Sequence, residues 1–167
     1  MRGGLPAVIH PIELADAGAH LHGHLPFQDM PRLRALCRDS GGEMSVDLRF
    51  ERDARGLRTM HGTFTGRLRL TCQRCLQAFD WEIHIEARLI LLKPGEPADG
   101  PAEEAETRMI EAPLPLSEIV EDEVLLAMPM SPMHEPRACA TAVPSDGPGR
   151  PGSAGPFDAL ARLKTER

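Results

Sequence analysis

Apolar and polar residues alternate along three stretches in the middle of the chain, at residues 44–50, 64–72 and 79–91. A period of two places the apolar side chains on one face of a half-buried β-strand. Turn-forming residues separate the stretches, at positions 52–56 and at Cys72-Gln73-Arg74-Cys75. The pattern therefore predicts an antiparallel meander whose second turn carries a CxxC motif.

Two segments with helical spacing flank this meander. In residues 29–38, Pro31 stands in the first turn of the predicted helix. In residues 117–128, Ser117 is placed as an N-cap, acidic residues follow in the first turn, and Pro129 ends the helix. The apolar positions are Leu33, Leu36 and Cys37 in the first segment and Val120, Val124, Ala127 and Met128 in the second.

The other segments give weaker signals. Ile9, Ile12 and Leu14 are interrupted by Pro11, which favours an edge strand or an extended segment. Residues 93–115 contain five prolines and many acidic side chains, a composition that predicts an acidic loop. Three closely spaced histidines are expected in a solvent-exposed loop: His20, His22 and His24.

Hydrophobic residues make up 41% of the chain and charged residues 26%, as in ordinary globular domains. We therefore predict one α+β domain over residues 1–139: the meander with its CxxC hairpin, packed by one or two helices, with the acidic loop. A mobile C-terminal tail is expected to follow. It comprises a Pro- and Gly-rich linker at 140–155 and a short amphipathic segment at 156–167, with apolar residues Phe157, Leu160, Ala161 and Leu163.

Charge and aromatic content narrow the function classes. The net charge is −6, which argues against a chain that coats nucleic acid, and all of the negative excess falls in residues 86–167. Aromatic residues make up only 4%, so base-stacking platforms are not expected. A secretory signal and a membrane-spanning run are both missing, so we expect a cytoplasmic protein whose four cysteines are free thiols or metal ligands.

Cys72 and Cys75 can bind one metal ion from a tight turn, because two thiolates separated by two residues share a coordination sphere. His134 and Cys139 follow with four residues between them, a spacing that second ligand pairs use. The four residues predict a tetrahedral zinc site. The alternative is that no metal binds: Cys72 is a small buried side chain at the end of a strand, Cys75 lies in the turn, and His134 and Cys139 lie on a surface segment. A redox pair is a third interpretation, but redox CxxC motifs open a helix, whereas this motif joins two predicted strands.

Charged side chains supply candidate contacts for a macromolecular partner. Arginines on the polar side of the strands and in the CxxC turn can contact phosphate groups of RNA, or can pair with acidic residues across the sheet. Acidic residues on the second helix suit a basic protein, or form an ordinary charged helix face. The candidate contact residues are Arg67, Arg69, Arg74, Glu121, Asp122 and Glu123. The sequence contains no recognised enzyme motif, so neither catalysis nor a small-molecule substrate is expected.

Three blocks of sequence together resemble one family. They are GTFTG at 62–66 with LTCQRCLQAF at 70–79, EIVEDEVLLAMPMSPMH at 118–134, and the segment at 156–164. In order and spacing they are similar to the YceD proteins, the large ribosomal RNA subunit accumulation family. This resemblance implies a role in synthesis, processing or stability of 23S ribosomal RNA, with no assigned catalytic residue. It suggests contact with a large-subunit ribosomal protein, an assembly factor or precursor RNA, while a zinc-knuckle RNA binder and a thiol redox protein remain alternatives.

Overall fold

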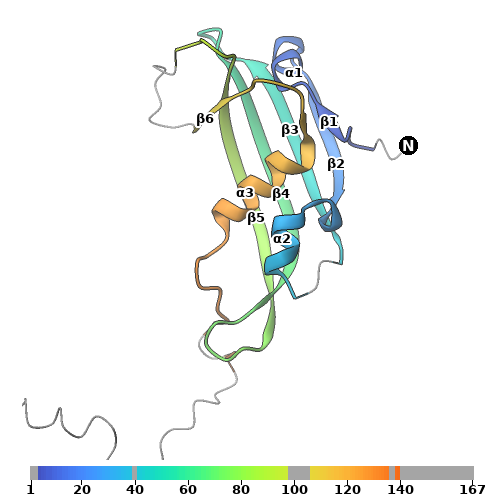
Figure 1. The fold of residues 1–167 in the computed structure, drawn as a ribbon, viewed down its shortest axis with the longest axis vertical. Coiled ribbons are helices and arrows are strands. Elements are labelled where there is room, and N and C mark those ends of the chain that lie inside the picture. The colour runs from blue at the N-terminus through green and yellow to red at the C-terminus, as the bar shows by residue number, and fades with distance from the viewer. Residues whose placement is uncertain (1–3, 39–40, 98–105, 136–137, 140–167) are drawn as a thin grey trace, which may run out of the picture.

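The computed structural model describes residues 4–38, 41–97, 106–135 and 138–139. Its centre is a five-stranded sheet in the order β2-β3-β4-β5-β6, with α2 and α3 lying across one face (Figure 1). The sheet strands are β2 (His20–Pro26), β3 (Glu43–Arg52), β4 (Arg58–Thr71), β5 (Ala78–Leu92) and β6 (Glu106–Met109). The remaining elements are β1 (Val8–Ile9), α1 (Pro11–Ala17), a 3-10 turn (Phe27–Asp29), α2 (Pro31–Leu36), β7 (Leu114–Pro115) and α3 (Leu116–Ala127).

The predicted meander is confirmed. The strands β3, β4 and β5 contain the three alternating stretches and pair antiparallel, with Phe64 opposite Val46 on one side and Ile85 on the other. The apolar residues of β3 and β4 face the helices, and the following are at most 1% exposed: Met44, Val46, Leu48, Phe50, Met60, Phe64, Leu68 and Leu70. Helices and a mostly antiparallel sheet share one core, so the fold class is α+β, as predicted.

The expectation of an extended N-terminal segment is wrong beyond Ile9. Pro11 begins α1 instead of interrupting a strand, and Ile12 and Leu14 lie within that helix. The fixed φ of proline suits the first position of a helix, where no N–H is needed. Gly18 ends α1 with a left-handed φ of 64°, a conformation that glycine adopts without steric cost.

The three closely spaced histidines were expected in a loop, but they lie in a strand. His20, His22 and His24 belong to β2, which pairs antiparallel with β3. Their side chains are exposed, because the alternate positions of the strand turn Leu25 toward the core. The prediction was therefore correct about exposure and wrong about secondary structure.

The acidic segment is more regular than expected. It contains two short strands, β6 and β7. The strand β6 pairs parallel with the end of β5. The next helix, α3, begins at Leu116, so Ser117 lies inside it and Pro115 takes the N-cap position. Residues 98–105, the predicted linker at 140–155 and the segment at 156–167 lie outside the described residues. In the described part of the chain, every helix is too short or too polar to span a membrane.

Candidate metal centre

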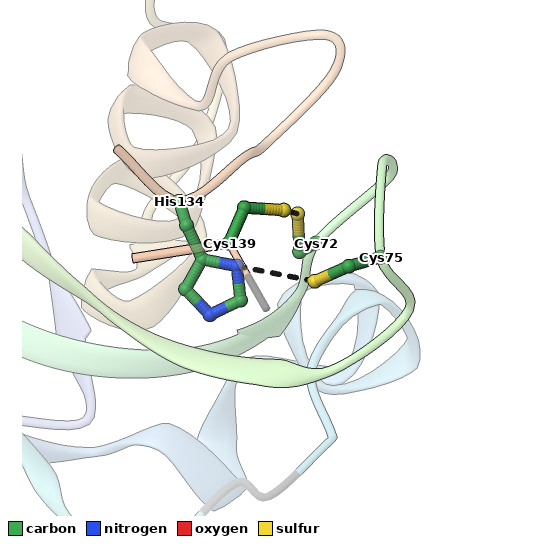
Figure 2. Close-up of side chains that lie close together, drawn as sticks. All are labelled: Cys72, Cys75, His134 and Cys139. Carbon is green, nitrogen blue, oxygen red and sulfur yellow. Dashed lines mark hydrogen bonds between the residues drawn. The ribbon is translucent and has the colours of Figure 1, made fainter. Parts of the chain in front are cut away.

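A knuckle joins β4 to β5 and presents two thiols on one side. The N–H of Cys72 donates to the carbonyl of Gln77, and the N–H of Leu76 donates to the carbonyl of Cys72, both at 2.9 Å. These bonds close a tight turn over residues 72–77. Because the turn is tight, Cys72 and Cys75 both direct their sulfur atoms toward the segment that follows α3 (Figure 2).

The segment after α3 brings the other two candidate ligands to the knuckle. The N–H of Gln73 donates to the carbonyl of Pro132 at 2.9 Å, which fixes the segment against the turn. The His134 ring packs on Phe79, with 5.0 Å between ring centroids. Cys139 is placed by its own N–H, which donates to the carbonyl of Glu135 at 3.2 Å. Residues separated by about sixty positions in sequence therefore meet in one cluster.

Two of the separations between the four ligand atoms match those around a tetrahedral zinc ion. All lie within 4.8 Å of one another. The Sγ atoms of Cys72 and Cys139 are 3.8 Å apart, and Cys75 Sγ is 3.4 Å from His134 Nδ1. Zinc bound at about 2.3 Å to sulfur and about 2.0 Å to nitrogen would separate two sulfurs by about 3.8 Å and a sulfur and a nitrogen by about 3.5 Å. This cluster can therefore hold a metal ion with little rearrangement.

The cluster also favours negative charge on one sulfur. Burial opposes ionisation of Cys72, but N–H groups of Cys75, His134 and Arg74 donate to its sulfur and lower its pKa to about 5. A hydrogen bond to Cys75, together with burial, raises the pKa of Cys139 to about 11. The protein environment thus stabilises one thiolate, and a bound cation would have to displace the remaining thiol protons.

Comparison with known families supports the resemblance drawn from the sequence. The family model described as large ribosomal RNA subunit accumulation protein YceD matches residues 60–164, more than half of the chain. The chain belongs to the YceD family. The matched range includes all four residues of the cluster, and the name of the YceD family indicates a role in accumulation of large-subunit ribosomal RNA. No solved structure matches the chain at a significant level.

In this YceD protein the candidate contact arginines lie apart from the acidic helix. Arg67 pairs with Glu82 across the sheet at 2.6 Å, and Arg69 is exposed opposite Asp80. Both lie on the solvent-exposed face of the sheet, away from the helices. Arg74 belongs to the knuckle, where its guanidinium lies 3.6 Å from the sulfur of Met133. The six candidate contact residues therefore form no single surface.

The three acidic candidates on α3 differ in their accessibility. Glu121 is only 3% exposed and is bonded within the protein. Asp122 pairs with Arg32 at 2.6 Å and with Arg108 at 2.9 Å. Burial, followed by repulsion from Glu106, raises the pKa of Glu123. Glu123 is the one member of the three without an ion pair among the described residues, so it is the most available to a basic partner.

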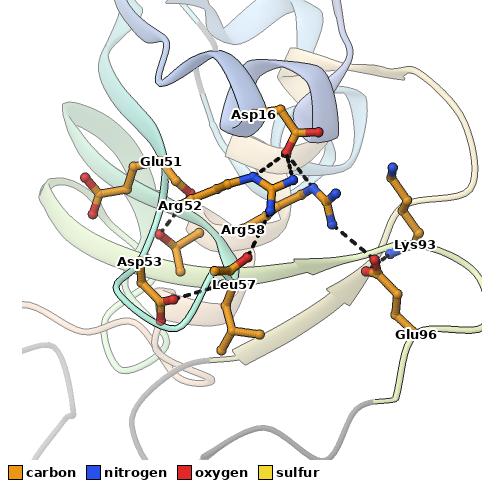
Figure 3. Close-up of polar contacts among 10 residues, drawn as sticks. Asp16, Glu51, Arg52, Asp53, Leu57, Arg58, Lys93 and Glu96 are labelled. Carbon is orange, nitrogen blue, oxygen red and sulfur yellow. Dashed lines mark hydrogen bonds and ion pairs between the residues drawn. The ribbon is translucent and has the colours of Figure 1, made fainter.

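Two features of this YceD protein were missed by sequence reasoning. Leu76, next to the CxxC motif, has a left-handed φ of 61° and is 63% exposed. Tight turns usually have glycine at a left-handed position. Here a leucine follows the motif directly, and this mismatch between residue and turn was the available signal. The second feature lies at the other end of β4, where Asp16 accepts hydrogen bonds from Arg52 and Arg58 (Figure 3). No local pattern marks that cluster.

Proposed function

We propose that this YceD protein is a non-catalytic accessory factor in the synthesis, processing or stability of 23S ribosomal RNA, acting during biogenesis of the large subunit in the cytoplasm. The observation that carries the proposal is the family match over residues 60–164. A non-catalytic role is supported by the composition of the cluster. Four protein ligands complete a tetrahedral zinc shell and leave no position for water or substrate, which is the pattern of structural zinc sites.

In this proposal, Cys72, Cys75, His134 and Cys139 bind a structural zinc ion. The ion would join the knuckle to the segment after α3, in addition to the hydrogen bond from Gln73 to Pro132. The separations of 3.8 Å and 3.4 Å within the cluster support this assignment. A redox role has weaker support, because the CxxC motif lies between two strands and does not open a helix.

The partner is proposed to be a basic ribosomal protein or assembly factor. The acidic side chains on and beside α3, of which Glu106 and Glu118 are exposed, favour a positively charged protein over RNA, whose phosphates they would repel. A cleft of about 430 Å³ beside α3 is lined by Glu106, Asp122 and Glu123 and also by Arg32 and Arg108, so the acidic side chains exceed the basic ones there by one. Of the three candidate arginines, Arg67 offers less to RNA, because it is already paired with Glu82.

Metal analysis of the purified protein tests the zinc assignment. We expect one zinc ion per chain, and loss of zinc in the double variant Cys72→Ser with Cys75→Ser. Cys37→Ser is the matched control, because Cys37 is a cysteine outside the cluster and should not affect the zinc content. A wild-type protein that is purified without chelators and contains no transition metal would refute the assignment.

The ratio of 23S to 16S ribosomal RNA in cells tests the biological role. Deletion of the gene should lower the ratio, and the wild type and Cys37→Ser should both restore it. The zinc-ligand double variant should fail to do so. An unchanged ratio after deletion would refute the role itself. Rescue by the double variant would show that the role does not need the cluster. Direct RNA binding is a separate outcome, shown by affinity that falls steeply with salt and with loss of Arg67, Arg69 and Arg74.

A further inference from the structure

An apolar groove of about 340 Å³ lies beside the knuckle. Its walls are the end of α2, the end of β4 and the last turn of α3 with the segment that follows it. The main lining residues are Leu36, Leu70, Leu125, Met128, Met130 and Pro132. None of the described residues that line the groove is charged, so an occupant would make mainly apolar contacts.

Large apolar side chains are exposed around this groove. Leu36 is 56% exposed, and Met130 is fully exposed at the rim. Leu126 does not line the groove; it is 70% exposed and lines the cleft beside α3. A group of exposed apolar side chains at a concave site is typical of a surface that another segment covers.

We propose that residues 156–164 of the same chain bind in this groove. This segment carries Phe157, Leu160, Ala161 and Leu163 at helical spacing, with Asp158 and Arg162 between them. Its apolar side chains are the kind of group that an uncharged groove accepts. The family match also continues through residue 164, so the segment belongs to the same family unit as the groove.

The connection between the groove and the segment is short. Cys139, next to the start of the linker, has its sulfur 3.8 Å from that of Cys72. The neighbours of Cys72 are Thr71 and Gln73, which line the groove. A chain with the length of residues 140–155 spans about 22 Å on average, enough to return to the groove. Such a tether gives an effective concentration on the order of 1 mM, so even weak apolar contacts favour binding within the chain.

Methionine methyl NMR on the full chain tests this proposal. The eight methionines each give one methyl signal, which substitution by leucine assigns. We expect nuclear Overhauser effects between the Phe157 ring and the methyl groups of Met128 or Met130. The double variant Phe157→Ser with Leu160→Ser should shift both methyl signals and leave Met109 unchanged, because Met109 lies on β6 outside the groove. Arg162→Ser, on the polar side of the segment, is the matched control and should shift neither signal.

Two results would overturn the proposal. One is the absence of these Overhauser effects, with Met128 and Met130 signals unaffected by the double variant. The other is an Overhauser effect that occurs only between differently labelled chains in a mixed sample, which would assign the groove to a second copy. The readout does not require zinc or ribosomal RNA, so it is independent of the proposed function.

Discussion

The carboxylate of Glu121 accepts a hydrogen bond from the backbone N–H of Leu33 at 2.9 Å, across 88 positions of sequence. Its second oxygen accepts a bond from Nε of Arg32 at 2.8 Å. Leu33 lies in the first turn of α2, where N–H groups have no partner within the helix. A side chain of α3 therefore supplies the cap that α2 lacks, and joins the two helices that cover the sheet.

Replacing Glu121 by alanine should lower the free energy of unfolding by about 2 kcal/mol, because the buried N–H of Leu33 loses its acceptor. Glu121→Gln should lower it less, since the amide oxygen can still accept that bond. Glu118→Gln is the control, because the Glu118 side chain is about half exposed and, among the residues that the structure describes, bonds only to Arg108. Urea unfolding measures all three variants. Equal stability of Glu121→Ala and the wild type would contradict the capping role.

The strands were predictable because their signal is local. Alternation within residues 44–50 and 64–72 decides which side chains are buried, and the sheet preserves that pattern. The four cluster residues were also found from sequence, since both ligand pairs have spacings that zinc sites use. The spacing does not predict the hydrogen bond from Gln73 to Pro132. This bond holds the two ligand pairs next to each other.

Contacts between distant segments account for most of what sequence reasoning missed. Glu121 was interpreted as part of an exposed charged face, because nothing in the helix pattern indicates that α2 packs over it. The strand β6 has no alternating pattern, and it forms because its backbone completes the edge of β5. In β2 histidine alternates with leucine or glycine, as in a strand, but the prediction for these residues is a loop rich in histidine.

Removing the metal should release the knuckle locally. If the ion joins the two ligand pairs, the N–H of Gln73 loses protection, since the zinc site holds its acceptor Pro132 in place. We expect faster hydrogen exchange at residues 72–77 after chelation, and a fall in melting temperature on the order of 10 °C for a tightly bound ion. The Leu33 N–H serves as internal control, because Glu121 protects it independently. Unchanged exchange at Gln73 would show that hydrogen bonds alone hold the segment.

The Asp16 cluster should make stability depend on pH. The hydrogen bond from Arg58 has the largest effect on the pKa of Asp16; burial opposes it, and the hydrogen bond from Arg52 lowers the pKa further, so that it lies below its usual 3.8. The folded state therefore favours the charged carboxylate. Its contribution is present above pH 3.8 and is lost as the pH falls through the lowered pKa.

Asp16→Asn should consequently be less stable than the wild type at pH 7, and the difference should shrink as the pH falls below 3.8. Thermal unfolding across this range measures it. Glu13→Gln is the control on the same helix, because Glu13 is 80% exposed and makes only a solvent-exposed pair with His10 at 3.6 Å among the described residues, so its loss should change stability little. A stability difference that is the same at pH 7 and well below pH 3.8 would mean that packing, not charge, makes Asp16 important.

Leu76 combines a left-handed backbone with an exposed apolar side chain, and two substitutions separate these properties. Leu76→Gly should raise the free energy of unfolding by up to about 1 kcal/mol, because glycine adopts a φ of 61° without steric cost. Leu76→Ala keeps the backbone strain and removes most of the side chain, so its stability should stay near that of the wild type. If the side chain contacts a partner, both variants should bind zinc yet fail to restore the ratio of 23S to 16S ribosomal RNA. Full restoration by both would show that the exposed leucine makes no essential contact.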